Sequence, residues 1–467
     1  MPTTDALLWA DALTQAAEIR AGNVSAAELT DAYLQRIDEI DPTLLSYIAV
    51  TADSARAEAA RADELVRAAA PGDELPPFLG VTISLKDVVD MAGVATTESC
   101  KALVDHVAEE DSPVVRRYRE AGFVILGKTN VPEFCTTMTG SELNGICRNP
   151  WDLERTPGGS SGGAAAALAA ALCGVAHGSD GAGSVRVPAS YTGLVGLKPT
   201  RGLSTSGPEE GRAYYGTAED GVLSRSVRDA AAVLDTMTTS PWSPVEAGAH
   251  AAAVGRAPGS LRVAVTVEPP MGAGDDECAQ AARDTAALLE SMGHRVVEAT
   301  PSWATILAVA LAPGGVGGMT RVPLDQVDQL EPRNRRLLER DHTVPAKDHV
   351  DWVARTREAG REFRRFWDDI DVLITPTCGI PAPSVDFAPW DQTADEHLLT
   401  FAGFPNFAQP FNLSGQPALS LPLAVHSTGL PVGVQLVGRL LEEPLLFSLA
   451  ATLEEAQPWA DRRPSAI

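Results

Sequence analysis

The most informative stretch of this chain reads Gly158-Gly-Ser160-Ser161-Gly-Gly163, then an alanine-rich run, then Gly178-Ser-Asp180-Gly-Ala-Gly-Ser184-Val-Arg186. It places two serines, Ser160 and Ser184, in separate glycine-rich turns. Glycine tolerates positive φ angles and lets a substrate come close to backbone N–H groups. Ordinary turns need one or two glycines, so this density predicts a nucleophile site.

Composition limits the possible classes of protein. The chain has 467 residues, of which 45% are hydrophobic and 21% charged, as in an ordinary globular protein. Its 62 Asp and Glu against 37 Lys and Arg give a net charge of -25, which disfavours binding to phosphate backbones or anionic lipid. We therefore expect no nucleic-acid partner and no membrane association.

The N-terminus and the cysteines indicate in which cellular compartment the protein is expected. Residues 1–6 lack a basic segment followed by an apolar one, so no secretory signal is visible and a cytoplasmic location is expected. The six cysteines form no C-x-x-C pair and no metal-ligand cluster with histidine, which predicts reduced core thiols. They are Cys100, Cys135, Cys147, Cys173, Cys278 and Cys378.

Periodicity predicts the organisation of the chain. Helices are expected over 7–21, 25–40 and 52–70, the second opened by the capping box Ser25-x-x-Glu28, and together they form a helical N-terminal cover. Short apolar strands then alternate with helices, which predicts an α/β sandwich around a mainly parallel or mixed sheet. The expected strands are 81–85, 123–126, 194–197, 261–267, 372–375, 418–423 and 432–437, and the expected helices 113–121, 164–173 and 278–292.

The alternation continues on both sides of two irregular sections. Residues 240–260 are rich in Ala, Gly and Pro, which indicates a surface connection. Residues 301–347 break the rhythm, and such insertions often form lids or pocket walls. We therefore predict a single domain over 1–467, with 301–347 as a variable insertion or lid.

Two motif matches are judged false. Gly122-Phe-Val-Ile-Leu-Gly127-Lys128-Thr129 fits the phosphate-loop pattern, but residues 123–126 are themselves the expected strand rather than a cradle of N–H groups. Residues 158–162 fit the nucleophile-elbow pattern G-x-S-x-G, but the polar, proline-ended segment 151–157 precedes them where an elbow needs an apolar strand.

The base that would activate a serine is left open by spacing alone. His177 lies shortly before Ser184, but a lone histidine after an apolar helix is more often a packing residue. Lys86 follows a predicted strand, at the carboxyl end where α/β proteins place their sites. A lysine acts as a base when burial lowers its pKa to about 7 to 8. The alternative is a surface ion pair of Lys86 with Asp87 or Asp90.

Several blocks of this sequence resemble the amidase signature family. The glycine–serine stretch 158–189 carries the strongest resemblance, and the other blocks extend from the first third of the chain to its C-terminal part. They are Ile83-Ser-Leu-Lys86-Asp87, Lys128-Thr-Asn-Val-Pro-Glu-Phe134, Gly193-Leu-Val-Gly-Leu-Lys-Pro-Thr200 and Gly429-Leu-Pro-Val-Gly-Val-Gln-Leu-Val-Gly438. The resemblance implies one α/β/α domain on a large mixed sheet and a Ser-Ser-Lys catalytic set.

Matched by motif, the resemblance implies Ser184 as nucleophile, Ser160 as bridging serine after a cis peptide, and Lys86 as base. The oxyanion hole would be formed by N–H groups of Gly181, Ala182, Gly183 and Ser184, supported by Ser161, Asp180 and Arg186. The family usually has Gly-Gly before the nucleophile, whereas this chain has Ala182-Gly183. Because Ala disfavours positive φ, either the hole is reshaped or residue 182 has ordinary backbone angles.

The resemblance implies a serine-dependent hydrolase of amide C–N bonds, without cofactor or metal. Aryl acylamidases and urethane-cleaving members are the suspected relatives, with carbamates and esters as further substrates. The pocket is expected from Phe134, Thr137, Met138, Gly140 and the 301–347 insertion, which are apolar and favour a small neutral acyl or aryl substrate. A monomer or homodimer is expected. The alternatives are an A-type subunit of a tRNA-dependent amidotransferase and a non-catalytic binding protein on the same fold.

Overall fold

The computed structural model describes residues 3–204, 216–238, 243–310 and 322–467. Within these residues the main sheet has 11 strands, in the order β1-β3-β2-β6-β8-β7-β12-β13-β11-β9-β10. The strands are β1 (Tyr47–Val50), β2 (Thr82–Lys86), β3 (Val124–Thr129), β6 (Val175–Asp180), β7 (Val195–Lys198), β8 (Glu219–Ser224), β9 (Arg262–Val265), β10 (Arg295–Glu298), β11 (Val372–Pro376), β12 (Ala418–Val425) and β13 (Pro431–Val437).

The sheet is mixed, as the sequence predicts. Strands β3, β2 and β6 run parallel, as do β11, β9 and β10, while the strands between these two groups pair antiparallel. A minor hairpin joins β4 (Gly140–Ser141) to β5 (Gly145–Ile146). Strands such as β2 and β13 are buried along their whole length, which requires helices on both faces of the sheet.

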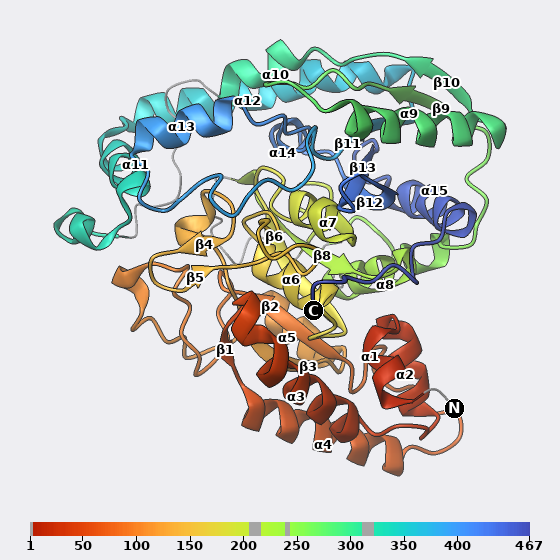
Figure 1. Cartoon of the computed structure of the whole chain (residues 1–467). Coiled ribbons are helices and arrows are strands. Elements are labelled where there is room, and N and C mark those ends of the chain that lie inside the picture. The colour runs from red at the N-terminus through yellow and green to blue at the C-terminus, as the bar shows by residue number, and fades with distance from the viewer. Residues whose placement is uncertain (1–2, 205–215, 239–242, 311–321) are drawn as a thin grey trace.

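Helices cover both faces of the sheet. Figure 1 shows α1 to α4 together at one end of the molecule and α9 with β9 and β10 at the other. The helices are α1 (Thr4–Trp9), α2 (Ala12–Arg20), α3 (Ala26–Leu44), α4 (Ala52–Ala68), α5 (Pro113–Glu120), α6 (Gly162–Ala169), α7 (Arg186–Thr192), α8 (Val227–Thr238), α9 (Asp276–Ser291), α10 (Trp303–Ala310), α11 (Pro332–Thr343), α12 (Ala346–Phe363), α13 (Ala394–Ala402), α14 (Gln409–Ser414) and α15 (Glu443–Ala456).

The N-terminal section differs from the prediction in two places. The expected helix 7–21 is two helices, because Asp11 caps α2 by accepting a hydrogen bond from the Thr14 N–H. Strand β1 was not predicted and pairs antiparallel with β3 at the edge of the sheet. The capping box of Ser25 and Glu28 is confirmed at the start of α3.

The inserted section is more regular than the sequence suggests. It contains helices α10 and α11, while residues 311–321 lie outside the described part of the chain. In the 240–260 connection, residues 239–242 likewise lie outside it, and a short 3-10 turn spans Ala251–Ala253. The insertion therefore contributes packed helices, and α11 contacts α13.

Two general expectations can be compared with the fold. All six cysteines are free thiols, and five are buried, whereas Cys135 is partly exposed. No helix in the described ranges is long and apolar enough to cross a membrane.

The sheet topology sets the position of the candidate site. Strand β2 ends at Lys86, and its parallel neighbour β6 ends at Asp180. Parallel neighbours end at the same edge of a sheet, so the residues that follow β6 come close to Lys86. The turn that carries Ser184 begins directly after Asp180.

Candidate active site

A cavity of about 450 Å³ opens next to Ser184. Its wall is formed by the loop after β3, the two serine turns with the start of α7, Met271, helices α10 and α11, and the segment from α13 to α14. The lining residues are Cys135, Thr136, Thr137, Met138, Gly159, Ala182, Ser184, Val187, Met271, Leu307, Ala310, Leu337, His397, Leu398, Phe401, Phe404, Asn406 and Gln409.

Lys86 lies beside this cavity and is completely buried. Its Nζ is 2.7 Å from Ser160 Oγ, 3.0 Å from Ser179 Oγ and 3.1 Å from the Ser179 carbonyl oxygen. These three partners fix the amine against the bridging serine that the sequence predicts. The structure therefore brings Lys86 and Ser160 into direct contact.

Burial lowers the pKa of the Lys86 ammonium, because a charged amine loses the hydration it has in water. Cys135 and Asp180 oppose this shift by favouring the charged form. The net direction is downward, towards the neutral amine that a general base requires.

The turn before Ser160 is tightly packed. The Gly159–Ser160 peptide bond is cis, as the resemblance implies. A Cβ at Gly159 would lie 2.1 Å from the Thr137 carbonyl oxygen, so glycine is required at this close approach. Ser161 joins the same network, since its N–H donates to the Ser184 carbonyl at 3.1 Å and its Oγ donates to the Ser179 carbonyl at 3.3 Å.

The turn that carries Ser184 is held by Asp180. The Gly183 N–H donates to Asp180 Oδ1 at 2.7 Å, and the Val185 N–H donates to Oδ2 at 3.2 Å. Gly183 has a φ of 112°, which requires glycine, whereas Ala182 has no positive φ. Residue 182 therefore has ordinary backbone angles, which is one of the two alternatives that the sequence left open.

The predicted oxyanion hole needs one correction. The Gly183 N–H was expected to face the substrate, but its short bond to Asp180 occupies it. Within the described residues, the N–H groups of Gly181, Ala182 and Ser184 donate no hydrogen bond. Of the four N–H groups in the prediction, these three are therefore not used in holding the turn.

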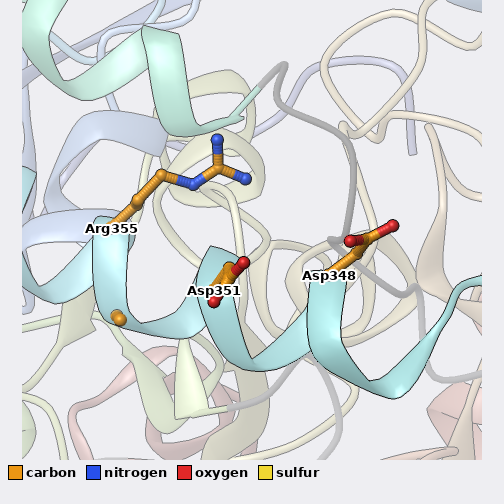
Figure 2. A pocket seen from close by; sticks show the side chains of 4 residues that line it. Asp348, Asp351 and Arg355 are labelled. Atoms are coloured by element: carbon orange, nitrogen blue, oxygen red, sulfur yellow. The ribbon is translucent and has the colours of Figure 1, made fainter.

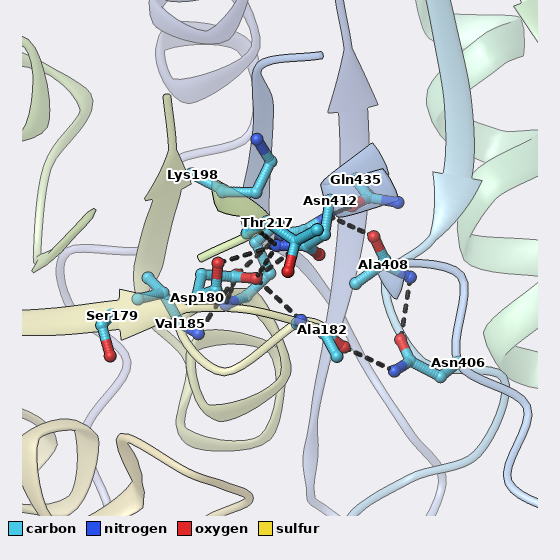
Figure 3. Close-up of polar contacts among 12 residues, drawn as sticks. Ser179, Asp180, Ala182, Val185, Lys198, Thr217, Asn406, Ala408, Asn412 and Gln435 are labelled. Carbon is cyan, nitrogen blue, oxygen red and sulfur yellow. Dashed lines mark hydrogen bonds and ion pairs between the residues drawn. The ribbon is translucent and has the colours of Figure 1, made fainter. Parts of the chain in front are cut away.

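Asn406 supports the other side of the same turn (Figure 3). Its Nδ2 donates to the Ala182 carbonyl at 2.8 Å, and its Oδ1 accepts from the Ala408 N–H at 2.8 Å. The Ala182 carbonyl is thus held in one direction, which orients the peptide groups beside Ser184. Asn406 was missed from the sequence because it lies in an irregular segment more than two hundred positions later.

Asp180 and Arg186 form a fully buried ion pair with an N–O distance of 2.8 Å. Arg186 also donates to Gln435 Oε1 at 2.7 Å and to Asn412 Oδ1 at 2.6 Å. Burial alone would raise the pKa of Asp180, but Arg186 holds it well below its usual value. The two charges are therefore paired in the structure, and Arg186 ties the Ser184 turn to α14 and β13.

Changing Asp180 to Asn is expected to destabilise the fold by about 3 to 5 kcal/mol, because it leaves the buried Arg186 charge without its partner. Urea unfolding would measure the loss. Asp31→Asn is the matched control, since its ion pair with Arg56 is 59% and 54% exposed and its loss is expected to change the free energy of unfolding far less. Equal effects of the two substitutions would contradict a supporting role for the Asp180 pair.

A second buried lysine lies behind this network. Burial, and then the neighbouring Arg186 guanidinium, lower the pKa of Lys198 to about 7. Its Nζ donates to the Pro199 carbonyl at 2.7 Å, and Lys198 does not belong to the described wall of the cavity. Of Lys86 and Lys198, Lys86 is the one whose amine contacts a serine hydroxyl.

The other interpretations of Lys86 and His177 are not supported by the geometry. Asp87 pairs with Lys128 at 3.0 Å and both are buried, so Lys86 is not half of a surface ion pair with Asp87. His177 Nε2 lies 3.2 Å from Asp220 Oδ1, and its Nδ1 accepts from the Lys86 backbone N–H at 3.4 Å. His177 therefore packs under β2 and does not face Ser184.

The two motif matches are false, as predicted. Residues Val124–Thr129 form strand β3, and Lys128 is buried against Asp87, so no phosphate-binding loop exists there. Ser160 follows a loop, not a strand, and so is not at a nucleophile elbow.

The predicted pocket residues divide into two groups. Thr137 and Met138 line the cavity, and Leu307, Ala310 and Leu337 contribute from the insertion. Phe134 and Gly140 do not line it, contrary to the prediction. Phe134 has a φ of 51° and packs with Val322, Leu330 and Leu338, and the Gly140 carbonyl accepts a hydrogen bond from Arg333.

A large part of the wall was missed from the sequence. It comes from the segment that contains α13 and leads into α14, and includes His397, Phe401 and Phe404. The sequence did contain one sign of this helix, the pattern Thr393-x-x-Glu396, which forms a capping box at the start of α13. Burial lowers the pKa of His397 to about 4, so its imidazole is neutral at physiological pH.

A second hollow on the described surface has no arrangement of side chains that suggests a catalytic site. Figure 2 shows a hollow on α12 lined by Asp348, Asp351, Ala354 and Arg355. Asp351 forms an ion pair with Lys347 on the same helix, which is typical of a solvated charged face. In the portion of the chain that the structure describes, no group of three His, Cys, Asp or Glu side chains is arranged to hold a metal ion.

Comparison with known proteins places this chain in a family. A family model described as Amidase matches residues 28–447. The chain is 38% identical to the 6-aminohexanoate-cyclic-dimer hydrolase of Pseudomonas sp. (strain NK87), over 98% of this chain and 97% of the relative. It is 35% identical to an acylamidase of Rhodococcus erythropolis, over 99% of this chain and 98% of the relative.

Solved structures agree with these sequence matches. The structure of 6-aminohexanoate cyclic dimer hydrolase complexed with substrate matches with a TM-score of 0.86 and 36% identity, covering 98% of this chain and 99% of that one. A bacterial aryl acylamidase shares the fold at 22% identity with a TM-score of 0.81. The α/β fold and these relatives define an enzyme that hydrolyses amide C–N bonds. The chain belongs to the amidase signature family.

Proposed function

We propose that this enzyme hydrolyses neutral amides and anilides through an acyl-enzyme on Ser184, with Ser160 as proton relay and Lys86 as general base. The observation that carries the proposal is the contact of 2.7 Å between Lys86 Nζ and Ser160 Oγ, beside the cavity that Ser184 lines. A buried amine with a lowered pKa beside a serine hydroxyl is an arrangement suited to base catalysis.

The proton path has two steps. Neutral Lys86 accepts the Ser160 hydroxyl proton, and Ser160 accepts the proton of Ser184 as Ser184 Oγ attacks the substrate carbonyl carbon. Within the described residues Ser184 Oγ makes no hydrogen bond, so its hydroxyl can turn towards Ser160 when substrate arrives. Catalytic hydrogen bonds commonly tighten only in the substrate complex.

The remaining steps balance the charges and protons. The tetrahedral oxyanion would be stabilised by the unused N–H groups of Gly181, Ala182 and Ser184, where losing one such donor typically costs about 3 kcal/mol in the transition state. Ser160 then donates a proton to the departing amine nitrogen as the C–N bond breaks, and it regains a proton from the Lys86 ammonium, which leaves Lys86 neutral for the second half of the reaction. Water attacks the acyl-enzyme, passes a proton to the same relay, and releases the carboxylic acid and free Ser184.

The cavity wall supports a neutral acyl or aryl substrate. Apolar side chains such as Met138, Leu307 and Phe404 form most of its described surface, and no Lys, Arg, Asp or Glu belongs to that surface. An unpaired substrate charge would lose its hydration there without gaining a partner. N-aryl carbamates and esters are included in the proposal because they present the same acyl carbon to Ser184.

A substrate panel tests this function. Purified protein, as a full chain without added partner, is expected to release 4-nitroaniline from neutral acyl-4-nitroanilides and to act more weakly on acyl groups that carry a carboxylate or ammonium. Liquid chromatography would quantify the products of amides, anilides, carbamates and esters in parallel. Inactivity on every neutral amide and anilide would contradict the proposal and favour a tRNA-dependent amidotransferase subunit or a binding protein.

A further inference from the structure

The start of α11 is hydrogen-bonded to the loop that forms one wall of the cavity. Asn334 Nδ2 donates to Glu133 Oε2 at 2.7 Å, and Asn334 Oδ1 accepts from Thr136 Oγ1 at 3.0 Å. The Glu331 N–H donates to the same Glu133 oxygen at 3.0 Å. Both hydrogen-bonding groups of the Asn334 amide are therefore used, and both partners lie in the loop after β3.

The same two segments are joined at a second point. Glu331 Oε1 accepts from the Glu142 N–H at 2.8 Å, and Arg333 donates to the Gly140 carbonyl at 3.0 Å. Arg333 also lies 2.5 Å from Glu331 Oε2. We call the bonded set Glu133, Thr136, Glu331, Arg333 and Asn334 the wall clamp.

Four members of the wall clamp are buried, which makes the hydrogen bonds among them costly to break, whereas Thr136 is partly exposed where it lines the cavity. Glu133 is 1% exposed, Glu331 3%, and Arg333 and Asn334 are both 0% exposed. Removing one partner of a buried hydrogen bond leaves the other without water to replace it. The two segments are therefore expected to move together rather than separately.

Both segments reach the cavity. Thr136 lines it directly, between Cys135 and Thr137, and Leu337 lines it from α11, one turn after Arg333. The position of Leu337 relative to the loop therefore depends on the wall clamp. A shift of α11 would widen the part of the cavity between these residues.

We propose that the wall clamp fixes α11 as a rigid cavity wall and so determines which acyl chains the enzyme accepts. The proposal rests on the proposed function, since it assigns the substrate's acyl chain to this cavity. Glu133, Asn334 and Arg333 are positioning residues that act through Thr136 and Leu337. The part of the insertion formed by 331–343 is then a fixed wall rather than a lid that opens at each turnover.

Three substitutions test the wall clamp. Thr136→Val removes the hydroxyl at nearly constant volume, Thr136→Ser keeps it, and Asn334→Ala removes the amide without touching the cavity. Arg336→Gln is the control, because this exposed residue of the same helix pairs with Asp395 outside the wall clamp. The probes are the 4-nitroanilides of acetic and hexanoic acid, which share one leaving group.

Thr136→Val and Asn334→Ala are each expected to lower the preference for hexanoyl over acetyl, as a ratio of kcat/KM, by about three- to tenfold. Thr136→Ser keeps the hydroxyl and is expected to keep the wild-type preference. Arg336→Gln is expected to leave the preference unchanged. In hydrogen exchange, Thr136→Val and Asn334→Ala should speed exchange in 133–142 and 331–343 together.

Two results would overturn the proposal. Unchanged exchange in both segments would show that the wall clamp does not hold them together, whether or not the anilides are substrates. Faster exchange with an unchanged hexanoyl preference would show that the acyl chain does not contact this wall. A wild-type enzyme that cleaves neither anilide would count against the proposed function, while the exchange result would still decide whether the wall clamp exists.

Discussion

Ser184→Ala is expected to abolish amide hydrolysis, with a loss of at least about 10⁴-fold in kcat, because no attacking oxygen remains. The fold should be unaffected, since Ser184 Oγ makes no hydrogen bond within the described residues whose loss would leave a buried partner unsatisfied. Initial rates on an acyl-4-nitroanilide would measure the loss, and thermal unfolding would check the fold.

The comparison with Ser161→Ala makes this test specific. Ser161 lies in the neighbouring turn, and its hydroxyl donates to the Ser179 carbonyl rather than facing the cavity wall. We expect a smaller loss from Ser161→Ala than from Ser184→Ala. Substantial turnover by the Ser184 variant would sink the assignment of the nucleophile.

Lys86→Ala is expected to lower activity by about 10² to 10⁴-fold at neutral pH, the usual contribution of a general base. Burial lowers the pKa of Lys86, so in the wild type the neutral amine persists to lower pH than for an exposed lysine. Activity should therefore fall as pH falls through this lowered pKa, because protonation removes the base.

The pH profile separates a base from a structural lysine. In Lys86→Ala the fall of kcat/KM at low pH that is due to protonation of the lysine should disappear. The residual rate should then rise only as the hydroxide concentration rises. Lys86→Arg is a useful second variant, because an arginine keeps the positive charge and cannot deprotonate. A profile in Lys86→Ala with the same limb as the wild type would argue against Lys86 as the base.

The central residues could be predicted from the sequence because each lies in a strong local pattern. Lys86 ends an apolar strand, and Ser160 and Ser184 lie in turns where glycine is required at Gly159 and Gly183 for packing and for backbone angle. Such constraints act over a few neighbouring residues. The resemblance to a family then assigned a role to each residue.

Contacts between distant segments could not be predicted in the same way. The Ser184 turn is tied to α14 and β13 through the hydrogen bonds of Arg186 with Asn412 and Gln435, more than two hundred positions away. Asn406 braces Ala182 from a segment without clear periodicity. Phe134 adopts a left-handed backbone that turns it into a cluster with Leu338, and no local pattern indicates this conformation.

Some misses in the fold could have been avoided. Asp11 stands before Ala12 as a helix cap, so the break between α1 and α2 was visible in the sequence. The capping box at Thr393 likewise marks α13. Strand β1 is different, because it is a four-residue edge strand held by its pairing with β3 and its contact with α6, both distant in sequence.

The most direct test of the account is to trap the acyl-enzyme and locate the acyl group. Protein quenched during turnover of the hexanoyl-4-nitroanilide would be digested and analysed by mass spectrometry. We predict that fragmentation of the acylated peptide locates the hexanoyl group on Ser184 rather than on Ser160, and that the Ser184→Ala protein carries none. An acyl group on Ser160, or on Cys135, whose thiol belongs to a residue lining the same cavity, would contradict Ser184 as the nucleophile.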